Sequence, residues 1–337
     1  FETVVCIEND AHCRETLRHN RKSWKLIETD KVQVGGELKS RTPGDIRTIT
    51  CDEILSVASL KKGEPDLVVG GAPCQPFSNI GKKKGQNDES NGDLFLEFVR
   101  VVRGTLPKAF IFENVVGITQ NKHREVVDYM ESKFKGLGYG VSTTVLNAAD
   151  YGVPQKRERF FIVGIQGIDR PAFPLPTHYS NRNSWDKFIS EFSMSPTRRP
   201  KKWITVQEAL LSIPEDSESR PDYALMNISE KVRERMTYIR QGQNFKVVPT
   251  ELLPNCWKNG KHQGQDTFGR LREDRPSITI RTAGYNPSKG MYIHPWEDRG
   301  LSTVELASLQ GFPFSWEFKC LGREKITLVS GGRQIGN

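Results

Sequence analysis

The sequence predicts an α/β protein with a doubly wound, mostly parallel sheet and a second, smaller domain. Short segments that are apolar on both faces alternate with helix-like segments from the start of the chain to about residue 167. Strands with this pattern are typical of parallel sheets that helices cover on both sides. Beyond residue 167, prolines, serines and charged residues dominate, and this change of texture predicts the second domain.

The expected elements alternate in the order that such a sheet requires. Each strand is a short run rich in Val, Ile, Leu or Phe, and the helices are longer and more polar. The segment 124–137 is the clearest helix, because it is amphipathic and is closed by Gly136 and Gly138. The expected strands are 3–7, 66–69, 109–112 and 160–164, and the expected helices are 11–20, 93–100, 124–137 and 303–310.

The second domain is expected to interrupt the first. Residues 168–275 carry 18 basic and 14 acidic side chains, so they hold +4 of the chain's net charge of +8. After them the chain reads as short strands and turns, and then as the helix 303–310. We therefore expect residues 1–167 and 296–337 to form one domain and residues 168–295 to form the other.

The composition is that of a soluble protein inside the cell. The apolar fraction of 36% rises to roughly 45% when glycine is counted. The sequence shows no apolar run of about eighteen residues and no signal peptide, which predicts a cytoplasmic protein without a membrane span. The excess of 49 Lys and Arg over 41 Asp and Glu is compatible with a polyanionic partner. None of the six cysteines forms a C-x-x-C pair, so no metal site is expected.

One cysteine differs from the other five in its surroundings. Cys74 follows the expected strand 66–69 in the stretch GGAPCQPFS, where two glycines and two prolines fix the backbone. A thiol on such a loop can be exposed, and nearby backbone N–H groups or cations can activate it. The pattern indicates a nucleophile, and a structural loop cysteine is the alternative.

Carboxyl groups stand at the ends of two other expected strands. Glu8 follows 3–7, and Glu113 follows 109–112. In open α/β sheets, ligands bind where the parallel strands end. We therefore expect Cys74 and Glu113 to face one cleft, although a loop residue or a helix cap is the alternative for a single glutamate at a strand end.

Two basic runs lie near these residues in the sequence. In QKRER, which precedes the strand 160–164, alternation places Arg157 and Arg159 on one face, where they would suit an anionic or carbonyl-bearing substrate. The second run consists of three lysines between two glycines: Lys82, Lys83 and Lys84. This pattern suits a mobile loop that closes over phosphates. Solvated surface charge is the alternative for both runs.

Taken in order, seven motifs resemble those of the DNA (cytosine-5)-methyltransferase family, in particular its bacterial restriction-modification type. They span nearly the whole chain. The motifs are PCQPFS (73–78), NGDLF (91–95), ENV (113–115), VLNAADYGVPQKRERFFIVG (145–164), RPSITIRTA (275–283), LSTVELASLQGFP (301–313) and RQIGN (333–337). The resemblance implies a Rossmann-like, S-adenosylmethionine-dependent methyltransferase fold in which 168–295 recognises the DNA target. It implies methyl transfer from S-adenosylmethionine to carbon 5 of a specific cytosine in duplex DNA.

The resemblance also implies a role for each matching position. Cys74 would be the nucleophile that bonds to a flipped-out base, and Glu113 would contact the edge of the cytosine ring. Arg157 and Arg159 would hold the base and its backbone. The implied cofactor contacts are Glu8 at the ribose, Asp45, Ile46 and Leu94 at the adenine, Pro73, and Asn337 near the methionine end. The implied DNA contacts are Gln75 and Ser78 in the catalytic loop, with Lys82, Lys83 and Lys84.

Three alternatives stay open beside this interpretation. They are a tRNA-methylating branch of the same family, a catalytically inactive DNA-binding relative, and a nicotinamide dehydrogenase. The long segment between the arginine motif and RPSITIRTA favours DNA, the intact Cys74, Glu113 and Arg159 favour activity, and the chain contains no G-x-G-x-x-G. The expected partner is duplex DNA, bound by a monomer, and a cognate restriction endonuclease stays an open question.

The resemblance departs from the family pattern at the two ends. In that family a glycine-rich loop precedes the ribose carboxylate, but only seven residues precede Glu8 here. The last motif also stops at Asn337. We therefore expect these residues alone to bind S-adenosylmethionine weakly, with the loop supplied by flanking residues or by a second polypeptide.

Overall fold

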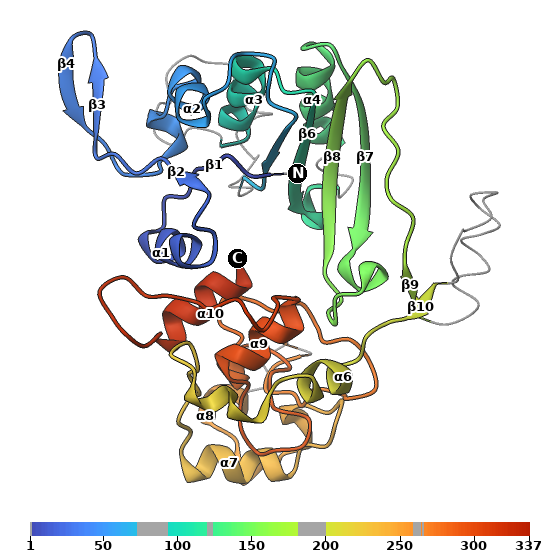
Figure 1. Cartoon of the computed structure of the whole chain (residues 1–337). Coiled ribbons are helices and arrows are strands. Elements are labelled where there is room, and N and C mark those ends of the chain that lie inside the picture. Colours follow the sequence, from blue (N-terminus) through green and yellow to red (C-terminus); the bar gives the residue numbers. More distant parts are fainter. Residues whose placement is uncertain (1, 73–93, 120–123, 181–199, 259–263, 265) are drawn as a thin grey trace. The chain divides into compact units, whose positions relative to one another are not determined.

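The computed structural model divides into two compact units (Figure 1). It describes residues 2–72, 94–119, 124–180, 200–258, 264 and 266–337. The first unit is Phe1–Arg14, Arg21–Leu146 and Glu158–Leu175, and the second is Glu15–Asn20, Asn147–Arg157 and Pro176–Asn337. Several predicted site residues lie outside the described residues: Pro73, Cys74, Gln75, Ser78, Lys82, Lys83 and Lys84. The expected domain division at residues 167 and 295 stays a prediction.

A four-stranded sheet forms the centre of the first unit. Its strands are β5 (Leu67–Gly70), β6 (Ala109–Val115), β8 (Glu158–Gln166) and β7 (Tyr139–Asn147), in that spatial order. β5 runs parallel to β6, and β8 runs antiparallel to β6. The link between β7 and β8 is too short for a crossover helix, which explains why β8 returns antiparallel. The strands expected at 66–69, 109–112 and 160–164 are confirmed, whereas β7 was not predicted.

Smaller elements complete the first unit, which includes only the start of α1, since Glu15–Asn20 belong to the second unit. They are β1 (Val5–Cys6), α1 (Ala11–Asn20), β2 (Lys25–Leu26), β3 (Lys31–Val34), β4 (Glu37–Ser40), α2 (Cys51–Ala58), α3 (Leu94–Thr105) and α4 (Arg124–Lys135). β1 pairs parallel with β2, while β3 and β4 form an antiparallel hairpin. Its turn, Gly35 and Gly36, has φ values of +60° and +86°, the left-handed region that two-residue hairpin turns require. The helices expected at 11–20, 93–100 and 124–137 are confirmed, and the hairpin was not predicted.

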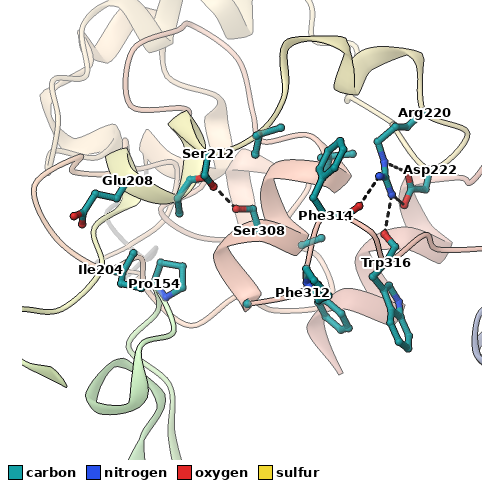
Figure 2. Close-up of a pocket in the computed structure, with 16 residues that line it drawn as sticks. Pro154, Ile204, Glu208, Ser212, Arg220, Asp222, Ser308, Phe312, Phe314 and Trp316 are labelled. Carbon is teal, nitrogen blue, oxygen red and sulfur yellow. Dashed lines mark hydrogen bonds and ion pairs between the residues drawn. The ribbon is translucent and has the colours of Figure 1, made fainter. Parts of the chain in front are cut away.

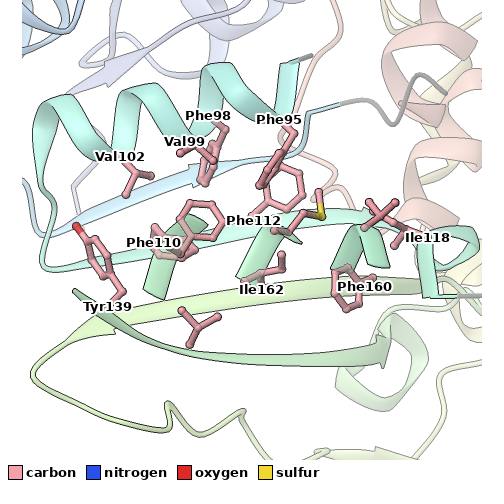
Figure 3. Close-up of a cluster of buried hydrophobic side chains, with 14 residues drawn as sticks. Phe95, Phe98, Val99, Val102, Phe110, Phe112, Ile118, Tyr139, Phe160 and Ile162 are labelled. Carbon is pink, nitrogen blue, oxygen red and sulfur yellow. The ribbon is translucent and has the colours of Figure 1, made fainter. Parts of the chain in front are cut away.

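A cluster of aromatic rings joins the sheet to its helices (Figure 3). Phe95 of α3 meets Phe112 of β6 edge to face, with ring centroids 5.4 Å apart, and Phe110 of β6 lies 4.1 Å from Phe134 of α4. All four rings are buried. Burial of each Phe side chain contributes about 2–3 kcal/mol, so this cluster fixes the position of β6. Glu113 follows Phe112 directly, and its placement therefore depends on this core.

The second unit consists of short helices joined by irregular segments. Its helices are α6 (Val206–Leu211), α7 (Glu230–Thr237), α8 (Asn255–Lys258), α9 (Thr303–Gln310) and α10 (Leu328–Gly336), and β9 (His178–Tyr179) pairs parallel with β10 (Lys201–Lys202). α9 confirms the helix expected at 303–310. The short strands expected before it are isolated bridges, such as the one between Arg270 and Ile293. In the part of the chain that the structure describes, no helix is long and apolar enough to cross a membrane.

A buried ion-pair network stabilises the start of α9. Glu305 completes a capping box with Ser302, Arg299 Nη2 lies 2.8 Å from Glu305 Oε1, and His294 Nε2 lies 3.4 Å from the same oxygen. Burial alone would raise the pKa of Glu305, but the hydrogen bonds from Arg299 and His294 lower it well below its ordinary value. A lowered folded-state pKa adds stability above the unfolded-state value of about 4.3 and loses it as the pH falls.

We expect Glu305→Gln to lower the free energy of unfolding at pH 7 by about 3 kcal/mol, because the partly buried Arg299 loses its ion pair with the Glu305 carboxylate. The difference between the two unfolding free energies should shrink as the pH falls below about 4. In that range Glu305 of the unfolded wild-type chain takes up a proton, so wild type loses the stability that the charged carboxylate contributes. Urea denaturation between pH 3 and pH 7 measures both effects.

Glu208→Gln is the matched control for this substitution. Glu208 completes the equivalent capping box with Thr205 at the start of α6, and glutamine fills that position as well as glutamate. Its cost should stay below about 1 kcal/mol. Equal losses for the two variants, or a Glu305→Gln penalty that is the same at pH 3 and pH 7, would show that the ion pairs contribute nothing.

Candidate active site

Glu113 and Arg159 form an ion pair across the two central strands of the sheet. In the register of β6 and β8, Glu113 stands opposite Phe161 and Val115 stands opposite Arg159, so the pair lies on a diagonal. Arg159 Nε is 2.8 Å from Glu113 Oε1. The Glu113 side chain stays 34% exposed, against 18% for Arg159. The sheet therefore presents a carboxylate that one side chain orients and that a ligand can still reach.

The segment that leads to Cys74 runs beside this carboxylate. A Cβ atom on Gly71 would lie 2.9 Å from Glu113 Oε2, so the backbone at Gly71 passes directly beside the carboxylate. Buried Asn114 donates from Nδ2 to the carbonyl oxygen of Ala72 at 3.1 Å and fixes the segment against β6. β5 and β6 are paired neighbours in the sheet, while the position of the Cys74 thiol stays a prediction.

Arg157 has different partners from Arg159. The sequence predicted that strand alternation places Arg157 and Arg159 on one face. β8 begins at Glu158, so Arg157 lies outside the strand and alternation does not relate the two arginines. Arg157 belongs to the second unit, where its Nη1 donates to Ile280 O at 3.2 Å and its Nη2 to Asn337 O at 3.4 Å. These bonds tie Arg157 to the end of α10. A contact of Arg157 with the base stays a prediction.

Glu8 is the residue expected to contact the cofactor ribose, and that role stays a prediction. Its Oε1 accepts a hydrogen bond from the backbone N–H of Asp10 at 2.7 Å. Among the described residues, no donor to its Oε2 is found. Gly44 has φ of +74°, and a Cβ atom there would lie 1.9 Å from the Glu8 carbonyl oxygen, which places the turn 43–46 directly against Glu8. The expected ribose and adenine contacts are therefore neighbours.

The turn that holds Asp45 and Ile46 is fixed by two arginines. Arg47 Nε and Nη2 donate to the two carboxylate oxygens of Asp45 at 2.9 and 2.7 Å, and these hydrogen bonds lower the pKa of Asp45. Arg100 Nη2 on α3 donates to the Ile46 carbonyl at 2.7 Å, which anchors the turn to the helix that Leu94 begins. A carboxylate has lone pairs left after two such bonds, so Asp45 can still accept from an amine.

Three of the segments expected to contact the cofactor belong to the first unit. The turn 43–46 lies against Glu8, and half-buried Leu94 begins α3. Their contacts with the cofactor stay predictions. Asn337 belongs to the second unit, where its carbonyl accepts from Arg157. In the described ranges no group of three His, Cys, Asp or Glu side chains could hold a metal ion.

Two residues of this region were not predicted from the sequence. Asn114 stands inside the ENV motif, and its burial among polar partners is what distinguishes it. Arg14 is buried in α1, where its Nη1 donates to the backbone carbonyls of Glu8 and Pro43. One charged residue in a polar helix produces no periodic signal, so the sequence alone could not have indicated Arg14.

The second unit contains a separate pocket of about 380 Å³ (Figure 2). Phe312, Phe314 and Trp316 line one side of it. Its charged groups are satisfied within the chain, because Arg220 pairs with Asp222 at 2.7 Å and donates to the carbonyls of Phe314 and Trp316. The pocket holds none of the predicted site residues.

Comparisons with known proteins show the family of this chain. The family model described as C-5 cytosine-specific DNA methylase matches residues 1–337. Type II methyltransferase M.AquIA of Picosynechococcus sp. is 38% identical over 244 residues, which cover 70% of this chain and 89% of that protein. Type II methyltransferase M.NgoFVII of Neisseria gonorrhoeae is 33% identical over 336 residues, which cover 98% and 78%.

Solved structures give the same fold. A prophage-encoded E. coli protein named as a DNA modification methyltransferase matches with a TM-score of 0.62 and 20% identity, over 100% of this chain and 88% of that one. The S. pombe Dnmt2 methyltransferase matches with a TM-score of 0.56 and 15% identity, over 99% and 85%. The predicted α/β methyltransferase fold, with a central and mostly parallel sheet, is confirmed.

Proposed function

This chain belongs to the C-5 cytosine-specific DNA methylase family, and we propose that it methylates one specific cytosine of duplex DNA through a covalent bond from Cys74 to a flipped-out base. The relatives establish a DNA cytosine-5 methyltransferase of the restriction-modification type. The observation that carries the finer proposal is the Glu113–Arg159 pair, which lies beside the Gly71–Ala72 segment that leads to Cys74.

The family implies S-adenosylmethionine as the cofactor, which supplies a methyl group on a positively charged sulfonium. In our proposal Glu8 accepts hydrogen bonds from the ribose hydroxyls, and among the described residues its Oε2 has no donor that would compete with them. Asp45 and Ile46 bracket the adenine, and Leu94 covers it with an apolar face. Pro73 and Asn337 complete the proposed cofactor contacts.

Cys74 supplies the nucleophile that cytosine requires. Carbon 5 of cytosine is a poor nucleophile, but a thiolate that adds to carbon 6 converts the ring into an enamine that is reactive at carbon 5. A free thiol has a pKa of about 8.5, so backbone N–H groups of the loop or a nearby cation must favour the thiolate. After methyl transfer a base removes the proton from carbon 5, and the thiol leaves carbon 6.

Glu113 and Arg159 act on the other edge of the ring. As electrons move into the ring, the Glu113 carboxyl group in its protonated form donates a hydrogen bond or its proton to the ring nitrogen, and its other oxygen accepts a hydrogen bond from the neighbouring amine. Arg159 orients Glu113 through the 2.8 Å ion pair and has further N–H groups for the base carbonyl or a phosphate. This arrangement stabilises charge that develops only after Cys74 attacks. Arg157 would support the base and its backbone from the second unit.

The target base must leave the duplex for this chemistry. Carbon 6 and the ring edge are inaccessible in stacked DNA. DNA methyltransferases in general extrude the target base, which costs a few kcal/mol. Gln75 and Ser78 would contact the DNA around the position that the flipped base leaves. Three lysines would close over the DNA phosphates: Lys82, Lys83 and Lys84. We propose that residues 168–295 recognise the sequence around the target.

Transfer of a labelled methyl group separates this function from its alternatives. We expect the purified protein to label duplex DNA and to leave tRNA unlabelled, with 5-methylcytosine as the product after nuclease digestion. Labelled tRNA with unlabelled DNA would assign the chain to the tRNA-methylating branch. Absence of label in both, with retained binding to duplex DNA, would identify a catalytically inactive relative.

A further inference from the structure

Arg14 is a charged side chain that the first unit buries without a close carboxylate partner. It is 8% exposed and lies in the second turn of α1. The nearest acidic group, Glu28 Oε1, is 3.8 Å from Arg14 Nε, which is longer than a hydrogen bond. The buried Nε atom itself has no hydrogen-bond partner among the described residues. Burial of an arginine costs several kcal/mol unless its bonds are good, so its position calls for a specific reason.

The bonds that Arg14 does make connect two particular segments. Its Nη1 donates to the carbonyl oxygen of Glu8 at 3.0 Å and to the carbonyl oxygen of Pro43 at 3.1 Å. Glu8 carries the proposed ribose contact, and Pro43 directly precedes Gly44, where the adenine turn begins. The close approach of Gly44 to the Glu8 carbonyl brings the same two segments together. One guanidinium therefore holds both halves of the proposed adenosine contact.

We propose that Arg14 is a positioning residue that sets the separation between the ribose contact at Glu8 and the adenine contact at Asp45 and Ile46. In an adenosine the ribose and the base are bonded directly, so their protein contacts must keep one fixed spacing. A shift of about 1 Å in such a contact can cost a hundredfold. This inference rests on the proposed cofactor site, and Arg14 acts on the cofactor only through Glu8 and the turn 43–46.

Calorimetry with S-adenosylhomocysteine tests the inference without any need for catalysis. We expect Arg14→Gln to raise the Kd for this ligand at least about tenfold, because glutamine is too short to reach both carbonyls and carries no charge. The Kd for 5′-methylthioadenosine, which shares the adenosine but lacks the amino acid, should rise by the same factor. Affinity for duplex DNA, and kcat at saturating S-adenosylmethionine, should stay within about twofold of wild type, so the defect should appear in KM alone.

Two further variants separate positioning from a general loss of structure. Arg14→Lys keeps the charge and a flexible donor, so it should recover part of the lost affinity; it also serves as the test if Arg14→Gln does not fold. Tyr139→Phe is the matched control, because it removes another buried donor to a backbone carbonyl, the 2.6 Å bond to Pro107 O, at the start of β7. Tyr139→Phe should leave both ligand affinities unchanged.

The outcomes distinguish this inference from the proposed function. If wild type binds S-adenosylhomocysteine and both Arg14 variants bind it equally well, the positioning role is wrong. A loss confined to S-adenosylhomocysteine, with normal binding of 5′-methylthioadenosine, would place the effect at the amino acid end and also overturn it. If wild type itself binds neither ligand, the proposed cofactor site fails, and the inference fails with it.

Discussion

Cys74→Ser should abolish the denaturation-resistant complex that the wild-type protein forms with duplex DNA carrying 5-fluorocytosine at the target. In the proposed reaction the thiol stays bonded to carbon 6 until a proton leaves carbon 5. Fluorine cannot leave as a cation, so methyl transfer succeeds and elimination stops, which traps the enzyme on the DNA. Serine cannot replace the thiol, because an alcohol is far less ionised and far less nucleophilic. Denaturing gel electrophoresis with and without S-adenosylmethionine measures the complex.

The other cysteines provide matched controls for this prediction. Cys6→Ser, Cys13→Ser, Cys51→Ser, Cys256→Ser and Cys320→Ser should each leave the trapped complex intact. Cys6 is the most informative of them, because it stands two residues before Glu8, and burial together with the charge of Glu8 raises the pKa of its thiol to about 11. Cys74→Ser should still bind DNA reversibly, since phosphate and base contacts come from other residues. A trapped band that persists in Cys74→Ser would refute the nucleophile assignment.

Glu113→Gln should lower kcat on the order of 10²–10³-fold, the effect of removing one preorganised group that stabilises developing charge. The change keeps the size of the side chain but removes the carboxylate that Arg159 orients at 2.8 Å. DNA affinity should change only a few-fold, because the contact strengthens as charge develops in the ring. Single-turnover kinetics at saturating DNA and cofactor separate the chemical step from binding.

Glu131→Gln is the matched control for Glu113→Gln. Glu131 also pairs with a cation, Lys135, at 2.8 Å in the first unit, but it lies on α4 outside the proposed site. Its replacement should leave kcat unchanged. A normal kcat for Glu113→Gln, or an equal loss of kcat in both variants, would show that Glu113 has no catalytic role.

The central strands of the fold were predictable because their sequence signal is strong. Ala109–Val115 alternates with buried Phe110 and Phe112 on one face, and its apolar run needs no tertiary information to read as a strand. β7 was missed, because Tyr139–Asn147 contains Gly140 and a run of Ser and Thr, and only part of it is buried. The β3–β4 hairpin was missed although its Gly35–Gly36 turn is a recognisable signal between two alternating runs.

The site was predictable as a set of residues but not as a set of contacts. Glu113 could be placed at a strand end, yet its pairing with Arg159 depends on β8 running antiparallel to β6 in one register. A one-residue slip would move Arg159 to the opposite face of the sheet. Arg14 was beyond prediction for a similar reason, since its two acceptors, Glu8 and Pro43, are distant in the sequence and meet only in the folded unit.

Mass spectrometry of the trapped complex tests the central claim most directly. After nuclease and protease digestion of the 5-fluorocytosine complex, the modified peptide should contain Cys74, with a methylated fluorocytosine nucleotide bonded to its sulfur. The mass should include the transferred methyl group, because elimination stops only after transfer. A nucleotide bonded to any other residue, or a methylated product recovered with no peptide attached while turnover is normal, would contradict the account.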